Sequence, residues 1–158
     1  MFVFAPRRTA YQVDPPADEI APDPATPRVL FVEDTDALRV SAVRILRAEG
    51  YVVSEARHGQ DALNVIERAA LPFDVVLTDV TMPVMSGYKL GRLLAHSDPS
   101  LPVLYMSSAP SAAMVRCGLP AGPTPFLRKP FLPEELIREV AALVALSPRC
   151  GGAASLVT

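Results

Sequence analysis

Short apolar runs alternate with amphipathic stretches along most of this chain. Five runs have the length of strands, and several are almost continuously apolar, which is typical of strands buried on both faces. These runs cover residues 28–33, 51–56, 73–78, 101–106 and 124–128. Because helical spacing fills the intervals between them, the pattern predicts an α/β domain in which helices cover both sides of a parallel sheet.

Four of these helices can be placed by their spacing and their end signals. The first is expected from about residue 36 to residue 49, with Gly50 just after its C-terminus. The second and third are expected at 60–70 and 87–96, and the last begins near Pro133 with two acids in its first turn. The positions expected to be buried are Leu38, Ala42, Ile45 and Leu46, then Ala62, Ile66 and Ala69, then Leu90, Leu93 and Leu94, and finally Leu136, Ile137, Val140 and Val144.

The ends of the chain and one internal stretch lack this regularity. Residues 1–27 mix six prolines with acids, so they are expected to form a disordered tail that cannot bury enough apolar area. Residues 147–158 are expected to be a second disordered tail, which leaves 28–146 as the folded domain. The prolines and glycines of 108–123 leave room for only one or two helical turns, so the fourth helix should be short or irregular.

Composition excludes several classes of protein. A chain of 158 residues supports one domain of ordinary size, and a net charge of −2 gives no basis for binding nucleic acid. Cys117 and Cys150 are far apart and outside any CxxC motif, which favours reduced thiols. No apolar stretch approaches the roughly 18 residues of a membrane span, and the N-terminus does not read as a signal peptide. A cytoplasmic protein without a membrane partner is expected.

Polar residues that carry chemistry end four of the apolar runs. Glu33 and Asp34 end the first run, and Asp79 ends the third and opens a loop rich in Pro and Gly. Ser107 and Lys129 follow the fourth and fifth runs. In open α/β sheets, ligands bind at the carboxyl ends of the strands. Plainer roles remain open, since Asp34 or Ser107 could cap the segment that follows and Lys129 could be a solvated lysine.

A sheet order of 2-1-3-4-5 would bring these side chains together. The first and third strands would then be neighbours about 4.8 Å apart, so the three acids could converge on one ion. Crowded carboxylates repel one another, and Mg²⁺ relieves that repulsion because it prefers oxygen ligands. A carboxylate is also a competent nucleophile toward phosphorus. The Lys129 ammonium and the Ser107 hydroxyl would then stabilise the phosphoryl oxygens.

Four motifs give the chain a resemblance to the receiver domain of bacterial two-component response regulators, over roughly residues 28–146. They are VLFVED at 29–34, VLTDVTMPVMSG at 76–87, VLYMSS at 103–108 and FLRKPF at 126–131. The last two look most like receivers attached to hybrid histidine kinases. The resemblance implies a flavodoxin-like (βα)5 fold.

The resemblance also implies roles for the acids. Asp79 would accept a phosphoryl group from a histidine kinase or a histidine phosphotransfer protein. Glu33, Asp34 and Asp79 would hold Mg²⁺ together with the backbone carbonyl of Thr81. The family more often has Asp where this chain has Glu33, and the longer side chain still reaches a metal.

Further residues match positions that transmit the signal in the family. Ser107 would be the switch hydroxyl, and Phe126 matches the aromatic switch position. Phe126 has no hydroxyl, so a plain core aromatic is the alternative for this residue. The Lys129–Pro130 peptide matches a bond that is usually cis in the family, and a cis X–Pro bond costs only about 0.5–1 kcal/mol over trans.

The leading functional hypothesis is a stand-alone, phosphorylation-controlled signalling module that is not an enzyme beyond assisting its own phosphotransfer and dephosphorylation. About a dozen residues follow the last helix, so output is expected through contacts with an unknown downstream protein, and a homodimer is a further expectation. The alternative is a degenerate receiver that binds proteins without phosphorylation. A small hydrolase or nucleotide-binding enzyme is disfavoured, because Thr81 stands where a DxD phosphatase needs an acid and no phosphate-binding Gly motif is present.

Overall fold

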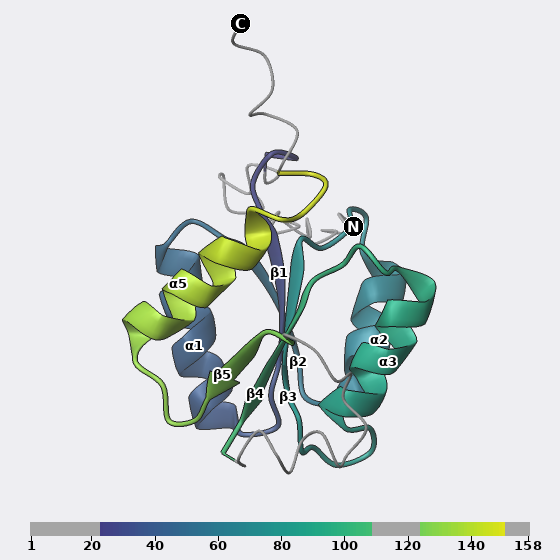
Figure 1. The fold of residues 1–158 in the computed structure, drawn as a ribbon, viewed down its shortest axis with the longest axis vertical. Coiled ribbons are helices and arrows are strands. Elements are labelled where there is room, and N and C mark those ends of the chain that lie inside the picture. The colour runs from purple at the N-terminus through teal and green to yellow at the C-terminus, as the bar shows by residue number, and fades with distance from the viewer. Residues whose placement is uncertain (1–22, 109–123, 151–158) are drawn as a thin grey trace, which may run out of the picture.

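Five parallel strands form the centre of the computed structural model, which describes residues 23–108 and 124–150 (Figure 1). The strands are β1 (Arg28–Val32), β2 (Val52–Ala56), β3 (Val75–Asp79), β4 (Val103–Ser107) and β5 (Phe126–Arg128). Their order is β2-β1-β3-β4-β5, with every neighbouring pair parallel. This order confirms the predicted flavodoxin-like arrangement. The predicted fourth helix falls mostly within 109–123, outside the described residues, as do positions 1–22 and 151–158 of the predicted tails.

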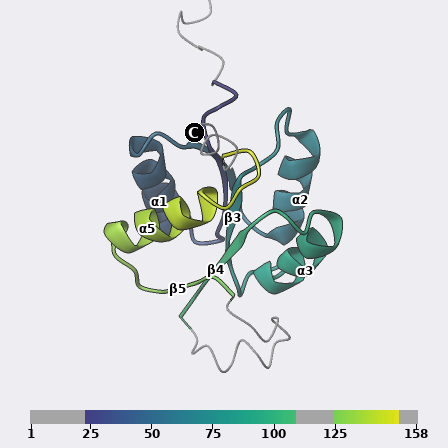
Figure 2. The same ribbon diagram turned by 45° about the horizontal axis from the view of Figure 1, so that its top comes forward.

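Helices cover both faces of this sheet. On one face lie α1 (Asp36–Ala48) and α5 (Pro133–Val144), and on the other lie α2 (Gly59–Arg68) and α3 (Gly87–Ser97) (Figures 1 and 2). Each face has its own core, centred on Phe31 and Leu136 under α1 and α5, and on Leu30 and Leu90 under α2 and α3. Within the described ranges, no helix is both long and apolar enough to cross a bilayer.

The face of α1 that packs on the sheet differs by about one position from the predicted face. Its buried residues are Arg39, Ala42, Val43 and Leu46. These positions follow the i, i+3, i+4, i+7 spacing of one helical stripe, whereas Leu38 and Ile45 lie at its edge and are half-buried. The expectation for Leu93 of α3 was wrong, since it is 41% exposed. Ile66, Ala69 and Ile137 are half-buried, and α5 also buries Leu143.

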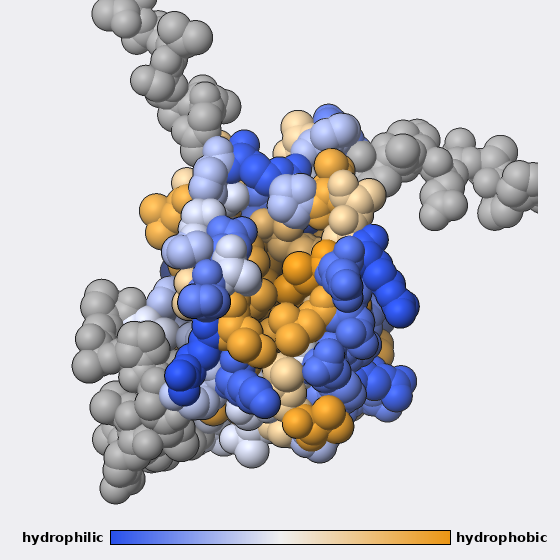
Figure 3. Space-filling model, turned by 90° about the vertical axis from the view of Figure 1, so that its right-hand side faces the viewer, coloured by the Kyte–Doolittle hydropathy of each residue, from blue (hydrophilic) through white to orange (hydrophobic). Residues whose placement is uncertain are grey.

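The side of the molecule formed by α2 and α3 carries an apolar hollow between polar margins (Figure 3). A groove of about 300 Å³ opens at the C-terminal ends of the two helices, and its lining includes Ile66, Ala69, Leu94 and Leu101. This groove lies away from the carboxyl ends of the strands.

A buried carboxylate organises the amino-terminal edge of the sheet. Asp74 is fully buried and accepts hydrogen bonds from the Arg28 N–H (2.7 Å), the Ser147 hydroxyl (2.8 Å) and the Arg149 Nη1 (2.9 Å). Arg149 also donates to the carbonyl oxygen of Pro24 at 2.6 Å. A buried carboxylate is costly unless charged and polar partners satisfy it, which explains why distant segments meet here.

This cluster brings together residues from the two predicted tails. Residues 23–27 and 147–150 were expected in the tails; of these, Pro24 and Pro27 accept hydrogen bonds from Arg149 and Val52, and 147–150 lie at the edge of the sheet. Ser147 is only 2% exposed, and Cys150 packs against the core under α5. Their composition gave no hydrophobic signal, because these segments are held mainly by hydrogen bonds and by charge.

Replacing Asp74 with Ala is expected to lower the free energy of unfolding by about 3 kcal/mol, because it leaves the Arg149 guanidinium and a backbone N–H without their buried acceptor. Asp74→Asn, which keeps an acceptor oxygen of similar size, should cost less. Urea denaturation of both variants measures the difference. A wild-type midpoint for Asp74→Ala would show that the cluster contributes nothing to stability.

Candidate functional site

A polar cleft of about 470 Å³ opens at the carboxyl edge of the sheet. Its lining residues are Glu33, Asp34, Thr35, Asp79, Thr81, Ser107, Ser108 and Lys129. The structure therefore brings together the acids, the serine and the lysine that the sequence placed at the ends of four strands. Thr81, Thr35 and Ser108 complete the wall, whereas Phe126 is not among the described residues that line it.

Three carboxylates converge in this cleft. One oxygen from each of Glu33, Asp34 and Asp79 lies within 4.8 Å of the others. The sheet register produces this, since Val32 pairs with Thr78 at the end of the β1–β3 ladder and the next residue on each strand is an acid. Glu33 is fully buried and Asp79 is 8% exposed, whereas Asp34 faces solvent. The triad is thus reached from one open side.

Lys129 bridges two of the carboxylates. Its Nζ lies 2.5 Å from Glu33 Oε2 and 3.1 Å from Asp79 Oδ1. The Lys129 N–H donates to the Ser107 carbonyl oxygen at 2.9 Å, which continues the β4–β5 pairing by one residue and fixes the lysine beside the site. The Lys129–Pro130 peptide is cis in the structure. An ammonium between two carboxylates offsets their mutual repulsion.

The loop after β3 depends on a glycine. The Gly87 N–H donates to the Val80 carbonyl oxygen at 3.1 Å, and a Cβ at Gly87 would lie 1.9 Å from the carbonyl oxygen of Asp79. The same carbonyl accepts a hydrogen bond from the Thr78 hydroxyl at 3.0 Å. The start of α3 is therefore seated directly on the backbone of Asp79, an approach that only a residue without a side chain permits.

The loop between β1 and α1 holds Glu33 at several points. The Glu33 N–H donates to the Ala56 carbonyl oxygen at 3.0 Å, and its own carbonyl accepts from Arg39 Nη1 at 2.8 Å. The Thr35 N–H donates to Glu33 Oε1 at 3.2 Å. Thr35 occupies the N-cap position of α1, so the alternative of Asp34 as that cap is not seen.

Arg39 is the residue at this site that the sequence analysis missed. Its hydrogen bond and its charge, together with the charge of Arg57, hold the pKa of the Asp36 carboxyl below its ordinary value. The available signal was positional, since an arginine falls on the same helical stripe as Ala42, Val43 and Leu46. A charged residue on an apolar stripe normally requires a buried partner.

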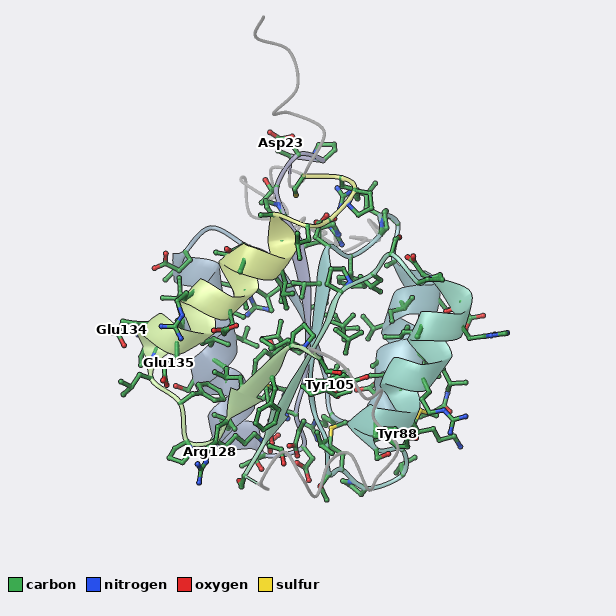
Figure 4. All side chains as sticks on the ribbon, viewed as in Figure 1. Asp23, Tyr88, Tyr105, Arg128, Glu134 and Glu135 are labelled. Atoms are coloured by element: carbon green, nitrogen blue, oxygen red, sulfur yellow. The ribbon has the colours of Figure 1, made fainter. Side chains whose placement is uncertain are left out.

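The two predicted switch residues lie in different surroundings. Ser107 ends β4, is 4% exposed and lines the cleft. Phe126 is half-buried and packs in a small cluster with Val80 and Tyr105. Tyr105 and Tyr88 lie toward the α3 side of the sheet (Figure 4), and burial raises the pKa of the Tyr105 hydroxyl. Phe126 is therefore connected to the site through its neighbours, and its switch role stays a prediction.

A parallel sheet in this order, with an acid triad and a lysine at its carboxyl edge, defines an α/β domain of the receiver class. Residues 29–141 match the family described as the response regulator receiver domain. The chain belongs to this family. Receiver domains as a class accept phosphoryl groups from histidine kinases or phosphotransfer proteins and bind Mg²⁺ at an acidic pocket.

The relatives include kinases as well as regulators. The chain is 38% identical over 117 residues to sensor kinase CckA of Brucella abortus, covering 73% of this chain and 12% of that protein. It is also 38% identical over 117 residues to response regulator MprA of Mycolicibacterium vanbaalenii, covering 74% of this chain and 50% of that protein. The chain thus spans half or less of the length of these relatives.

Solved structures show the same fold. The chemotaxis protein CheY4 of Vibrio cholerae superposes with a TM-score of 0.67 at 31% identity, covering 75% of this chain and 98% of that one. The receiver domain of the hybrid histidine kinase CckA superposes with a TM-score of 0.59 at 34% identity, covering 74% of this chain and 98% of that one. Both matches cover nearly the whole of the compared chain, so the likeness is that of a complete receiver domain.

Proposed function

We propose that this chain is a phosphorylation-controlled receiver in which Asp79 accepts a phosphoryl group, with Mg²⁺ required, from a histidine kinase or a histidine phosphotransfer protein. The observation that carries the proposal is the convergence of Glu33, Asp34, Asp79 and Lys129 in one cleft open on one side. A triad of carboxylates with a lysine ammonium beside it suits phosphoryl transfer better than it suits a structural role.

The donor set fits Mg²⁺. Three carboxylates whose oxygens lie within 4.8 Å of one another offer the hard oxygen ligands that this ion prefers, and the open side leaves room for water and phosphate. Glu33, Asp34 and Asp79 would hold the ion, with the backbone carbonyl of Thr81 from the same cleft. When bound, the ion supplies positive charge that stabilises the phosphoryl oxygens.

The chain's own groups account for the rest of the transfer. A carboxylate oxygen of Asp79 attacks the phosphorus, and the bond from phosphorus to the donor nitrogen breaks as the acyl phosphate forms. Lys129, already 3.1 Å from Asp79, is placed to pair with the phosphoryl oxygens. The Ser107 hydroxyl donates a further hydrogen bond. The added charge of about −1.5 to −2 then shifts a pre-existing equilibrium between surface conformations, with Phe126 as the second switch residue.

The wider role follows from this chemistry. Output passes through contacts between the receiver surface and a downstream protein, without nucleic acid or membrane as a partner. A second copy of the chain, in a homodimer, is a further partner. The chain is not an enzyme toward external substrates, although its cleft assists its own phosphorylation and dephosphorylation. The cytoplasm is the compartment in which a histidine kinase would supply the phosphoryl group.

Intact-mass measurement after incubation with Mg²⁺ and acetyl phosphate tests the proposal. A phosphate-sized adduct is expected. It should disappear when EDTA removes the metal, because the crowded carboxylates then repel the negatively charged phosphate. If no adduct forms, Mg²⁺ and beryllofluoride titrations decide between two cases. Binding of both would indicate a receiver that rejects small donors, whereas binding of neither would overturn the proposal in favour of a degenerate receiver.

A further inference from the structure

Arg39 is a charged residue in a buried place. It lies on the stripe of α1 that packs on the sheet, and it is 5% exposed. Arginine is almost never buried unless it is paired, so its surroundings should show what holds it there. Its side chain reaches past the start of α1 toward the ends of β1 and β2.

Three different nitrogens of Arg39 meet three different partners. Nη1 donates to the backbone carbonyl of Glu33 at 2.8 Å, and Nη2 donates to Asp36 Oδ1. Nε forms an ion pair with Glu55 Oε2 at 3.5 Å. The planar guanidinium can satisfy all three because its donors are fixed in a fork, whereas a lysine ammonium is a single point charge.

The contact with Glu33 completes a set that fixes this residue. The N–H of Glu33 is held by Ala56 of the edge strand, and its carboxylate is held by Lys129 and by the Thr35 N–H. Arg39 holds the remaining backbone group, the carbonyl. Without Arg39 that carbonyl would lose the side-chain donor that holds it, and the link from Glu33 to α1 and to Glu55 would be lost.

Arg39 does not serve as a counterion for the three carboxylates of the cleft. Two carboxylates, Asp36 and Glu55, already neutralise it. A cation near a divalent metal site would also weaken metal binding by repulsion, so removal of its charge alone would tighten Mg²⁺ binding. Loss of orientation acts in the opposite direction, because partners that orient metal ligands typically contribute 10- to 100-fold to metal affinity. The direction of the change therefore separates the two effects.

We propose that Arg39 is a positioning residue that orients Glu33 for Mg²⁺ by holding its backbone carbonyl while anchoring the loop to α1 and β2. The inference rests on the proposed function, since it concerns the same metal site. Arg39 does not contact the metal position itself, and it acts only through Glu33.

Isothermal titration of Mg²⁺ into wild type, Arg39→Met and Arg39→Lys tests the proposal. Both variants are expected to bind Mg²⁺ at least about tenfold more weakly, because neither side chain reproduces the fork. Arg47→Met is the matched control: Arg47 lies on the same helix and also pairs with Glu55, at 3.2 Å, but makes no contact with Glu33 in the described part of the chain. The affinity of this control should equal that of wild type.

A second measurement, made without metal, does not depend on Mg²⁺ binding. The Thr35 amide, which donates to the Glu33 carboxylate, should exchange its hydrogen faster in the Arg39 variants than in Arg47→Met. Thermal melts establish whether each variant is folded at the titration temperature. If Arg39→Met is unfolded there, Arg39→Lys is compared with wild type instead.

Each outcome assigns the failure to one claim. Unchanged or tighter Mg²⁺ binding by folded Arg39 variants, with only a lower melting temperature, would overturn the positioning role and leave the proposed function intact. Absence of Mg²⁺ binding by wild type would instead overturn the proposed function, and the positioning role with it. Equal weakening in Arg47→Met would assign the effect to Glu55 and also overturn the role of Arg39.

Discussion

Asp79→Asn is expected to abolish the phosphate adduct that forms on wild type with Mg²⁺ and acetyl phosphate. The side-chain amide is nearly the same size as the carboxylate, but it is not a nucleophile toward phosphorus at neutral pH. The variant should also stay folded, since removal of one of three crowded carboxylates lowers their repulsion. Intact-mass spectra should therefore change from a labelled species to a wholly unlabelled one without any loss of secondary structure by circular dichroism.

A matched substitution at the far edge of the sheet controls for the loss of an acid. Asp98 lies after α3, beside Pro72 and Arg149, and faces solvent. Asp98→Asn removes the same charge and should be labelled as fully as wild type. Persistent full labelling of Asp79→Asn would show that the phosphoryl group resides elsewhere and would refute the assignment of Asp79.

Gly87→Ala is expected to destabilise the fold and to impair labelling together. The added Cβ would meet the Asp79 carbonyl oxygen at 1.9 Å and the Thr78 hydroxyl at 2.5 Å, so the backbone of the phosphoacceptor has to move. Helix propensity favours the change by about 1 kcal/mol. Overpacking against backbone costs about 1–3 kcal/mol or more, so the net loss should reach about 2 kcal/mol. Urea denaturation and the adduct mass measure the two effects on one sample.

Gly59→Ala provides the comparison for this substitution. Gly59 also begins a helix, but the atoms nearest to its added Cβ belong to the side chain of Met85, with Cγ at 2.6 Å. A methionine side chain can adjust more readily than the Asp79 backbone, so this variant should lose less stability than Gly87→Ala and should keep full labelling. Equal effects from the two substitutions would mean that contact with the Asp79 backbone is not what requires Gly87.

The strand ends could be predicted because local composition alone determines them. Continuous apolar runs end where a carboxylate, a serine or a lysine appears, and parallel topology then brings these residues to one edge. The cap of α3 is also local, since the Ser86 hydroxyl accepts the Lys89 N–H at 3.2 Å. Helix faces were less certain, since α1 has apolar residues on two adjoining stripes and only packing selects between them.

Long-range polar contacts are what the sequence could not reveal. Asp74 lies 73 residues from Ser147, and Arg149 lies 125 residues from Pro24, so no local pattern indicates that they meet. The burial of Arg39 depends on which stripe of α1 packs on the sheet, and tertiary packing decides that. Lys129 is an intermediate case. The sheet topology predicted that it lies near the acids, but only the structure shows that it bridges Glu33 and Asp79.

The hydrogen bonds around Asp74 bring the two ends of the described domain close together. Pro24 and Arg149 are joined by a 2.6 Å hydrogen bond at the amino-terminal edge of the sheet. A five-residue strand spans roughly 16 Å, so Asp79 lies about that far away at the other edge. A fluorescent reporter or a surface tether attached near residue 24 or residue 149 would leave the cleft clear. A circular permutant joining these two positions through a short linker would need little new chain to preserve the fold.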